Sequence, residues 1–337
     1  MHPERDKSLK GYNTFGIDVI AHRFFDIDTL GQLQEIIADQ KGEPLFVLGG
    51  GSNLLLTQPI TATVLRINLK GIAISSQDDD VVQLKVMAGE NWHDTVQYCV
   101  NHGYGGIENL SLIPGNIGAA PIQNIGAYGV ELKDVFVSCE AIDRSSGEEI
   151  TFSKEDCQFG YRDSFFKNEG KNKYIITSVS MKLTKGNHKI RTDYGAIAQT
   201  LTDAQITSPT IKDISSAVIK IRQSKLPDPA KIGNSGSFFK NPVIDDKAFE
   251  SFHEKFPEAP FYQVDEVHYK VPAGWLIEQA GFKGKRYGDA GVHDKQALVL
   301  VNHGSASGDE IWELAQTIQQ KVKEDFNIII EPEVTVI

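Results

Sequence analysis

The chain reads LFVLGGGSNLLL from Leu45 to Leu56, which is an apolar run, a glycine turn and a second apolar run. We expect the first apolar run to form a short buried strand. Consecutive glycines allow successive backbone N–H groups to converge on a phosphate, and Ser52 and Asn53 add side-chain donors. A glycine-rich hairpin that binds nothing is the alternative interpretation.

The same stretch restricts the kind of nucleotide-binding fold. It lacks the dinucleotide fingerprint, in which glycines stand at the first, third and sixth positions before a helix. It also lacks the P-loop with its Lys-Ser/Thr ending. A bound nucleotide would therefore require a fold other than a Rossmann unit.

A second unusual stretch reads IPGNIGAAPIQNIGAYG from Ile113 to Gly129. It has no charged residue but contains four glycines, two prolines and three amide side chains, so we expect neither a regular surface helix nor an ordinary solvated loop. A flat polar heterocycle such as a flavin ring fits this composition, because backbone amides can bond it while Ile and Ala pack against it. An internal domain interface is the alternative.

A third stretch reads GNSGSFFKNP from Gly233 to Pro242. Small residues and amides surround the hydroxyl of Ser237, and two aromatic residues follow it directly. The backbone can therefore approach a ligand closely while the apolar side chains exclude water. A turn cluster between two elements remains the alternative.

Composition sets outer limits on fold and partners. A chain of 337 residues is expected to form two or three domains, and 40% hydrophobic with 23% charged residues is ordinary for globular proteins. A net charge of -11 argues against a nucleic-acid or anionic-membrane surface, but it does not exclude an anionic small ligand. The cysteines, Cys99, Cys139 and Cys157, are expected to be core thiols in a reducing compartment.

Localisation and metal binding follow from what the sequence lacks. The first seven residues form no apolar signal segment, and no apolar stretch approaches the roughly 20 residues of a membrane span. We therefore expect a cytoplasmic protein. The nine histidines form no metal-binding pattern, so we assign no metal.

Periodicity predicts the main helices and strands. The predicted helices cover residues 30–37, 92–100, 211–221 and 275–280 and a longer segment from about Ser307, and the predicted strands cover 45–48, 64–69, 82–88, 135–141, 174–183 and about 328–337. Residues 161–167 interrupt the strand pattern, and Tyr194 lies in a connection expected to be polar. Arg162 can stabilise an enolate or carboxylate through its forked donors, or it can be a surface cation. Similarly, Arg222 and Lys225 can either complement a helix dipole or face a diphosphate.

Several motifs together resemble one family. The chain contains, in order, GGGSNLL, PGNIGAAPIQNIGAYG, YRDSFFK, RQSKLPDP, GNSGSFFKNP, AGWLIEQAGFKG and IIEPEV. Their order and approximate spacing resemble those of the bacterial UDP-N-acetylenolpyruvoylglucosamine reductase family, also called UDP-N-acetylmuramate dehydrogenase. The resemblance runs from about Asn13 to Val336, and the region around Tyr194 and Gly195 resembles the longer, type I branch.

The resemblance implies an α+β protein with the FAD-binding fold of the vanillyl-alcohol oxidase and p-cresol methylhydroxylase type. Two FAD-binding subdomains, residues 1–67 with the strand at about 328–337 and residues 68–210, would be followed by a substrate-binding domain at 211–327. It also implies that NADPH reduces non-covalently bound FAD, leaves, and is replaced by UDP-N-acetylglucosamine enolpyruvate. This ping-pong reaction is a cytoplasmic step of peptidoglycan synthesis, and so serves cell-wall biogenesis, shape and division. We expect a monomer.

The resemblance also assigns residues. It implies that Arg162 stabilises the enolate, that Ser237 donates the proton, and that Glu333 orients the enol or the proton path. The implied FAD-binding residues are Gly49, Gly50, Gly51, Ser52, Asn53, Pro114, Gly115, Asn116, Gly118, Ala119, Gly126 and Arg222. The implied substrate-binding residues are Tyr194, Lys225, Asn241, Lys283 and Gln296.

The chain departs from the family pattern at Asn116, where Thr is common, at Ser235, where Ala is common, and at Thr335, where Arg is common. The last change removes a cation near the flavin or Glu333, which leaves the local electrostatics and the pH optimum open. Two rival functions are an oxidase of the same fold and a non-catalytic binding protein. The oxidases often attach FAD through His or Cys, which the cofactor motifs lack. A binding protein would be expected to lose Arg162, Ser237 or Glu333.

Overall fold

The computed structural model describes residues 2–40 and 42–337, which form two compact units. The first unit comprises the segment up to Lys7 together with residues 21–50 and 60–224. The second comprises residues 8–20, 51–59 and 225–337. Each unit is therefore built from segments that are distant in sequence. The division at residues 67, 210 and 327 that the sequence suggests stays a prediction.

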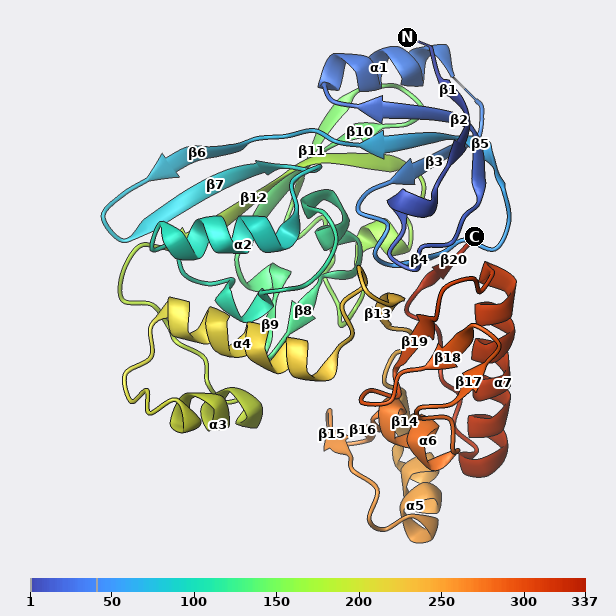
Figure 1. Cartoon of the computed structure of the whole chain (residues 1–337). Helices are drawn as coiled ribbons and strands as arrows, with labels where there is room; N and C mark the ends of the chain where they lie inside the picture. Colours follow the sequence, from blue (N-terminus) through green and yellow to red (C-terminus); the bar gives the residue numbers. More distant parts are fainter. Residues whose placement is uncertain (1, 41) are drawn as a thin grey trace. The chain divides into compact units, whose positions relative to one another are not determined.

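One sheet of the first unit has the strand order β1-β2-β5-β3 (Figure 1). Its strands are β1 (Glu4–Ser8), β2 (Ile20–Ile27), β3 (Leu45–Leu48) and β5 (Ile60–Ile67). Because β2 and β3 both run parallel to β5, the connection from β2 to β3 must cross over, and helix α1 (Leu30–Asp39) does so. Thr29 begins α1 with a capping box that includes Gln32. The predicted helix at residues 30–37 and the predicted strand at residues 45–48 are confirmed.

The second sheet of this unit has the order β11-β10-β12-β7-β6 and is antiparallel. Its strands are β6 (Ile72–Gln77), β7 (Val81–Met87), β10 (Phe136–Asp143), β11 (Glu149–Ser153) and β12 (Tyr174–Thr184). Alternate residues Val82, Leu84 and Val86 are fully buried, as the alternating pattern predicts. Helix α2 (Trp92–Asn101) adds Trp92 and Val96 to the same core.

The cysteines are buried free thiols, as expected. Burial raises the pKa of Cys99 to about 12. A hydrogen bond with the Cys157 thiol, together with burial, raises the pKa of Cys139. The Cys99 and Cys139 thiols therefore stay protonated near neutral pH and are poor nucleophiles.

Two helices end the first unit, α3 (Gly195–Asp203) and α4 (Ile211–Lys225). The prediction of α4 is confirmed, whereas the polar connection expected around Tyr194 is wrong. Ile197 and Leu201, four residues apart on α3, pack against Ile214 and Val218 of α4. Short elements join these parts: η2 (Glu108–Leu110), η3 (Ile117–Gln123), β8 (Gly126–Ala127), β9 (Val130–Glu131), η4 (Leu132–Asp134) and η5 (Phe165–Lys167).

The main sheet of the second unit has the order β13-β19-β18-β17, with the long helix α7 beside it (Figure 1). These elements are β13 (Gly233–Ser237), β17 (Arg286–Tyr287), β18 (Ala290–Val292), β19 (Val299–Asn302), α6 (Ala273–Gln279) and α7 (Gly308–Phe326). Ser307 and Glu310 form a capping box at the start of α7, which confirms the predicted start. A smaller group was not predicted: β14 (Val243–Asp245), α5 (Asp246–Lys255), β15 (Tyr262–Gln263) and β16 (His268–Lys270).

The chain ends in a short parallel pair of β4 (Leu54–Leu55) and β20 (Thr335–Val336), and η1 (Lys10–Tyr12) lies in the same unit. The strand expected to start at about residue 328 is wrong, because residues 328–330 form no ladder. Ile328 and Ile330 are buried and Ile329 is exposed, so the alternating burial of a strand occurs there without strand pairing. Among the described residues, no helix combines the length and the apolar character needed to cross a membrane.

Candidate active site

The glycine loop after β3 is tightly packed. A Cβ atom on Gly50 would lie 2.9 Å from both the Asn116 Oδ1 atom and the Gly115 Cα atom, so this glycine lets two loops meet. Gly51 has a φ of +61°, and a Cβ atom there would lie 2.0 Å from the Tyr12 carbonyl oxygen. Within the described part of the chain, the N–H groups of Gly50, Gly51 and Ser52 donate no hydrogen bond. These N–H groups can therefore bind a phosphate oxygen.

The uncharged segment, residues 113–129, is anchored by backbone hydrogen bonds, yet some of its residues are exposed. The Trp92 N–H donates to the Gly115 carbonyl at 2.9 Å, and the Gly118 N–H donates to the Ala88 carbonyl at 2.9 Å. Pro114 and Ala119 are nevertheless exposed. The segment forms the 3-10 helix η3 rather than an α-helix, which agrees with the expectation that it is not a regular surface helix. An anchored backbone with exposed small residues suits the docking of a flat ring.

Leu112, just before this segment, has an unusual backbone conformation. Its φ is +59°, a left-handed conformation that costs a leucine about 1–2 kcal/mol. The Leu112 N–H donates to His93 Nδ1 at 2.9 Å, and its carbonyl accepts from Arg222 Nε at 3.2 Å. Side chains from α2 and α4 thus bind both polar groups of this residue.

Arg162 is also in a left-handed conformation, with a φ of +54°. Its Nη2 atom donates to the Gly126 carbonyl at 2.6 Å. Lys167 Nζ donates to the Arg162 carbonyl at 2.9 Å, which fixes the backbone that carries the guanidinium. Gly126 is needed here, because a Cβ atom on it would lie 2.8 Å from Glu131 Cγ and 3.1 Å from Arg162 Nη1.

Asn124 is a fully buried amide beneath the Arg162 loop. Its Nδ2 atom donates to the Gly160 carbonyl and to Glu131 Oε2, each at 3.0 Å, and its Oδ1 atom accepts from the Lys133 N–H at 3.0 Å. The uncharged segment and the Arg162 loop, which lie far apart in sequence, are therefore joined by one side chain.

Arg222, Tyr128 and Tyr194 form a group in the first unit. Burial lowers the pKa of Arg222, and a charge interaction and hydrogen bond with Tyr128 oppose this shift. Burial also raises the pKa of Tyr128, so its hydroxyl stays protonated. Tyr128 and Tyr194 pack edge to face with ring centroids 5.4 Å apart, and Tyr194 precedes α3 as its N-cap.

Ser237 and Glu333 are brought together within the second unit. Ser237 ends β13 and is exposed, and no described residue forms a hydrogen bond with its hydroxyl. The Glu333 N–H donates to the carbonyl of Phe238, the residue after Ser237, at 2.8 Å. Asn53 Nδ2 donates to the Glu333 carbonyl at 3.2 Å. The glycine loop, the serine strand and the Glu333 segment are thus connected by hydrogen bonds.

Thr335 and Ser235 are two of the positions that depart from the family pattern. The Thr335 N–H donates to the Asn53 carbonyl at 3.1 Å, and its side chain is exposed. The Ser235 hydroxyl is buried without a hydrogen-bond partner in the described structure.

The predicted substrate-binding residues of the second unit occupy different places. Asn241 Oδ1 accepts from the Ala273 N–H at 3.0 Å at the start of α6, and Gln296 Oε1 would lie 3.2 Å from a Cβ atom on Gly274, also in α6. Lys283 follows α6 and pairs with Glu278 at 2.8 Å. Lys225 is the exposed last residue of α4. Asn241 and Gln296 are thus close to one helix.

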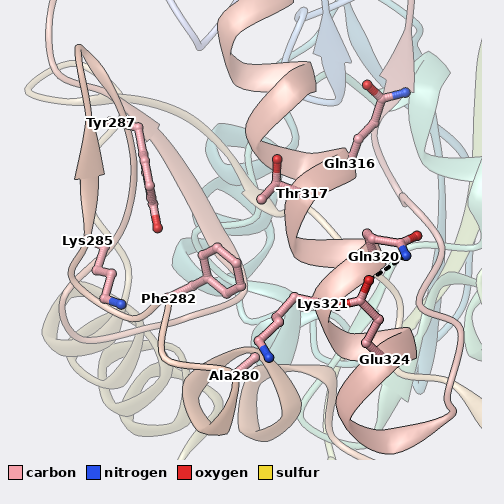
Figure 2. Close-up of a pocket in the computed structure, with 9 residues that line it drawn as sticks. All are labelled: Ala280, Phe282, Lys285, Tyr287, Gln316, Thr317, Gln320, Lys321 and Glu324. Atoms are coloured by element: carbon pink, nitrogen blue, oxygen red, sulfur yellow. Dashed lines mark hydrogen bonds between the residues drawn. The ribbon is translucent and has the colours of Figure 1, made fainter.

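A separate hollow of about 570 Å³ lies between α7 and the β17 region (Figure 2). Its lining residues are Ala280, Phe282, Lys285, Tyr287, Gln316, Thr317, Gln320, Lys321 and Glu324. None of them is a predicted site residue. Lys321 and Glu324 are already engaged, with Asp325 and Gln320 respectively. We therefore do not assign the active site to this hollow.

Sequence reasoning missed four residues that support the site: His93, Tyr128, Asn124 and Lys167. Tyr128 and Asn124 lie in the uncharged stretch, so their position was a usable signal. His93 and Lys167 act on backbone atoms of left-handed residues, which no sequence pattern reveals. Within the described residues, no group of three or more His, Cys, Asp or Glu side chains is arranged to hold a metal ion.

Two family models match this chain, and its curated relatives carry the name of one of these families. Residues 228–337 match the family model of the UDP-N-acetylenolpyruvoylglucosamine reductase C-terminal domain, and residues 24–153 match that of an FAD binding domain. The chain is 56% identical over 337 residues to UDP-N-acetylenolpyruvoylglucosamine reductase from Flavobacterium johnsoniae, covering 100% of both chains. It is 48% identical over 332 residues to the enzyme of that name from Chromobacterium violaceum, covering 97% of each.

Solved structures give the same result for the fold. The crystal structure of UDP-N-acetylenolpyruvylglucosamine reductase from Thermus caldophilus matches with a TM-score of 0.69 at 25% identity, covering 100% of this chain and 99% of that one. A solvent-stable cholesterol oxidase matches with a TM-score of 0.50 at 10% identity, covering 99% of this chain and 88% of that one. The second likeness concerns the fold alone, and it confirms the expected FAD-binding fold.

Proposed function

Because the chain belongs to the UDP-N-acetylenolpyruvoylglucosamine reductase family, we propose that it uses NADPH to reduce UDP-N-acetylglucosamine enolpyruvate to UDP-N-acetylmuramate. It is an FAD-dependent oxidoreductase of peptidoglycan synthesis. The match over the whole chain at 56% identity carries this proposal. We further propose a cytoplasmic monomer, built from two FAD-binding subdomains and a substrate-binding domain with the boundaries predicted above.

The residues around the glycine loop fit FAD. The N–H groups of Gly50, Gly51 and Ser52 are available for a diphosphate, and the tight contact at Gly50 leaves no room for a side chain. Pro114 and Ala119 offer an uncharged exposed surface for the ring. We propose that these residues bind FAD, together with Gly49, Asn53, Gly115, Asn116, Gly118, Gly126 and Arg222.

FAD supplies the redox chemistry when it is bound, namely the relay of hydride from NADPH to the enolpyruvyl double bond. The chain's own residues must then stabilise negative charge next to the substrate carboxylate and deliver one proton. We propose Arg162 for the first task, because a guanidinium offers forked donors to a carboxylate and the Arg162 backbone is fixed by Lys167.

Proton delivery is assigned to Ser237 and Glu333. Ser237 is exposed, and its hydroxyl forms no hydrogen bond with any residue that the structure describes, which supports its role as the proton donor. A serine is a weak acid in water, so it requires assistance from neighbouring groups. The hydrogen bond between the Glu333 N–H and the Phe238 carbonyl places Glu333 beside this strand, where it can orient the enol or the proton path.

Substrate binding is assigned to five residues that the family motifs imply. We propose Tyr194, Lys225, Asn241, Lys283 and Gln296 for the diphosphate, the sugar and the uridine. The lysines supply positive charge for the diphosphate, and the amides suit the sugar and the base. An overall charge of -11 makes local cations of this kind necessary for an anionic substrate.

The function is tested by anaerobic sequential mixing while flavin absorbance is recorded. NADPH should bleach the flavin, and UDP-N-acetylglucosamine enolpyruvate in the second mix should restore the absorbance without oxygen. Recovery only with oxygen would indicate an oxidase. A protein that remains colourless after incubation with FAD would indicate a binding protein without flavin chemistry.

A further inference from the structure

The backbone of Leu112 is held in a conformation that leucine rarely adopts. Its φ of +59° lies in the left-handed region, which favours glycine and asparagine. Such outliers persist only when surrounding groups enforce them, and they concentrate at functional sites. Leu112 directly precedes the uncharged segment proposed to bind FAD.

Two side chains enforce this conformation. His93 Nδ1 accepts from the Leu112 N–H at 2.9 Å, and Arg222 Nε donates to the Leu112 carbonyl at 3.2 Å. The residue before His93 provides the next anchor, because the Trp92 N–H donates to the Gly115 carbonyl at 2.9 Å. The start of α2 therefore fixes the chain on both sides of residues 113–114.

We propose that His93 and Arg222 are positioning residues that lock Leu112 and so preset residues 114–116 to bind FAD. This inference rests on the proposed function, since it takes FAD as the ligand. His93 need not touch the cofactor to have this effect, and Arg222, which is also proposed to bind FAD, contributes to it through its hydrogen bond to the Leu112 carbonyl. The cost of ordering the segment is then met during folding rather than during binding, which raises affinity.

The charge state of His93 is part of the arrangement. A backbone N–H can only donate, so the Nδ1 atom must be unprotonated and the ring must be neutral. Burial lowers the pKa of His93, Asp94 on the same helix opposes this shift, and Arg222 on α4 reinforces it. Protonation of Nδ1 would remove the acceptor and release Leu112.

Two variants of His93 distinguish the loss of the hydrogen-bond acceptor at Nδ1 from a change in the bulk of the side chain. In His93→Asn, the amide oxygen can take the place of Nδ1, whereas in His93→Gln the amide extends to the position of Nε2. We expect the dissociation constant for FAD, measured by flavin fluorescence on the apoprotein, to rise about tenfold in His93→Gln and to stay near the wild-type value in His93→Asn. His102→Gln, an exposed change at the C-cap of the same helix, is the control and should have no effect on FAD binding.

The pH profile gives a second readout. The wild-type dissociation constant should be flat above pH 6.5, the ordinary pKa of His, and should rise as the pH falls below it. The His93→Asn variant should lose this dependence. Equal FAD affinity in wild type and His93→Gln, or the same pH profile in wild type and His93→Asn, would overturn the role of His93.

The role of Arg222 is tested by a double-mutant cycle. If both side chains hold the same peptide unit, Arg222→Lys should weaken FAD binding less in the His93→Gln background than in the wild type. Strict additivity would show that Arg222 acts elsewhere and would overturn its part of the proposal. Circular dichroism melts of each apoprotein establish that the variants are folded. If the folded wild-type apoprotein binds no FAD, the proposed function itself is wrong. If the wild type binds FAD and the variants bind it equally well, only the positioning role is wrong.

Discussion

Ser237 and Ser235 differ in surroundings although they lie two residues apart on β13. Ser237 is exposed and Ser235 is buried. We expect Ser237→Ala to slow the reoxidation half-reaction by about 10²–10⁴-fold, as loss of a general acid does, while flavin reduction by NADPH stays at the wild-type rate. Stopped-flow absorbance measures both steps. Ser235→Ala is the matched control and should change neither. Wild-type reoxidation by Ser237→Ala would end the assignment of Ser237 as proton donor.

Lys167 acts through the backbone of Arg162. Its ammonium donates to the Arg162 carbonyl at 2.9 Å, so Lys167→Met should leave the left-handed residue less firmly held. We expect the reoxidation half-reaction to slow by about tenfold, with flavin reduction unaffected, because a hydrogen bond from a charged donor is lost. The exposed Lys171→Met is the control. Equal slowing of both half-reactions would instead indicate general damage to the fold.

At the scale of single residues, the sequence indicated the residues proposed to act in the reaction better than the residues that position them. Arg162, Ser237 and Glu333 follow from motifs, and their roles stay predictions. The left-handed backbone of Leu112 and Arg162 could not be predicted, because neither residue type favours that region. Side-chain hydrogen bonds of His93 and Lys167 hold these backbones, and the sequence neighbours of the two residues carry no sign of that role.

The glycine loop can be tested as an element. Gly50→Ala would place a Cβ atom 2.9 Å from Asn116 Oδ1 and from Gly115 Cα, so the two loops must separate. We expect the apoprotein to lose about 1–3 kcal/mol of unfolding free energy, as overpacked sites do. The nearest atom to a Cβ on Gly49 is Ala119 Cβ at 4.0 Å, so Gly49→Ala should change stability by less than about 1 kcal/mol. Urea unfolding measures both, and equal losses would contradict the packing argument.

Among the elements, long periodic helices were the most predictable. Helices α1, α2, α4 and α7 were predicted from apolar spacing and capping residues, and the structure confirms them. Helix α3 was missed because its few apolar residues stand in a polar segment and are buried through tertiary packing, mainly against α4. The strand predicted at about residues 328–337 forms only at Thr335–Val336, because residues 328–330 alternate in burial but have no partner strand.

At the scale of the whole molecule, the response to acid depends on partly buried aspartates that accept local hydrogen bonds. The Ser145 side chain, with backbone N–H groups, lowers the pKa of Asp143 below 3.8, and the Thr210 side chain does the same for Asp213. Because their pKa values are lower in the folded than in the unfolded chain, these groups stabilise the fold above pH 3.8 and lose that effect as the pH falls through the folded values.

We therefore expect the urea midpoint to fall as the pH decreases below about 4, and to fall less steeply in Asp143→Asn, which keeps an acceptor but cannot titrate. The control is Asp309→Asn, since Asp309 is exposed in the first turn of α7. Identical pH profiles for wild type and Asp143→Asn would contradict the prediction. High salt should reduce the difference only slightly, because the effect comes from hydrogen bonds within one turn.

Strand β4 can pair with β20 only after the ribosome has synthesised the long segment between them. Asn53 and Glu333, which are hydrogen-bonded beside this pair, are 280 residues apart in sequence. At the usual speed of translation, the segment after the glycine loop waits about 15 to 55 s for its partner strand to be made. Until then Leu54 and Leu55 have no neighbour on that edge, so a nascent chain must keep them from pairing with other strands. The glycine loop is therefore translated long before the strand that pairs with the residues following it.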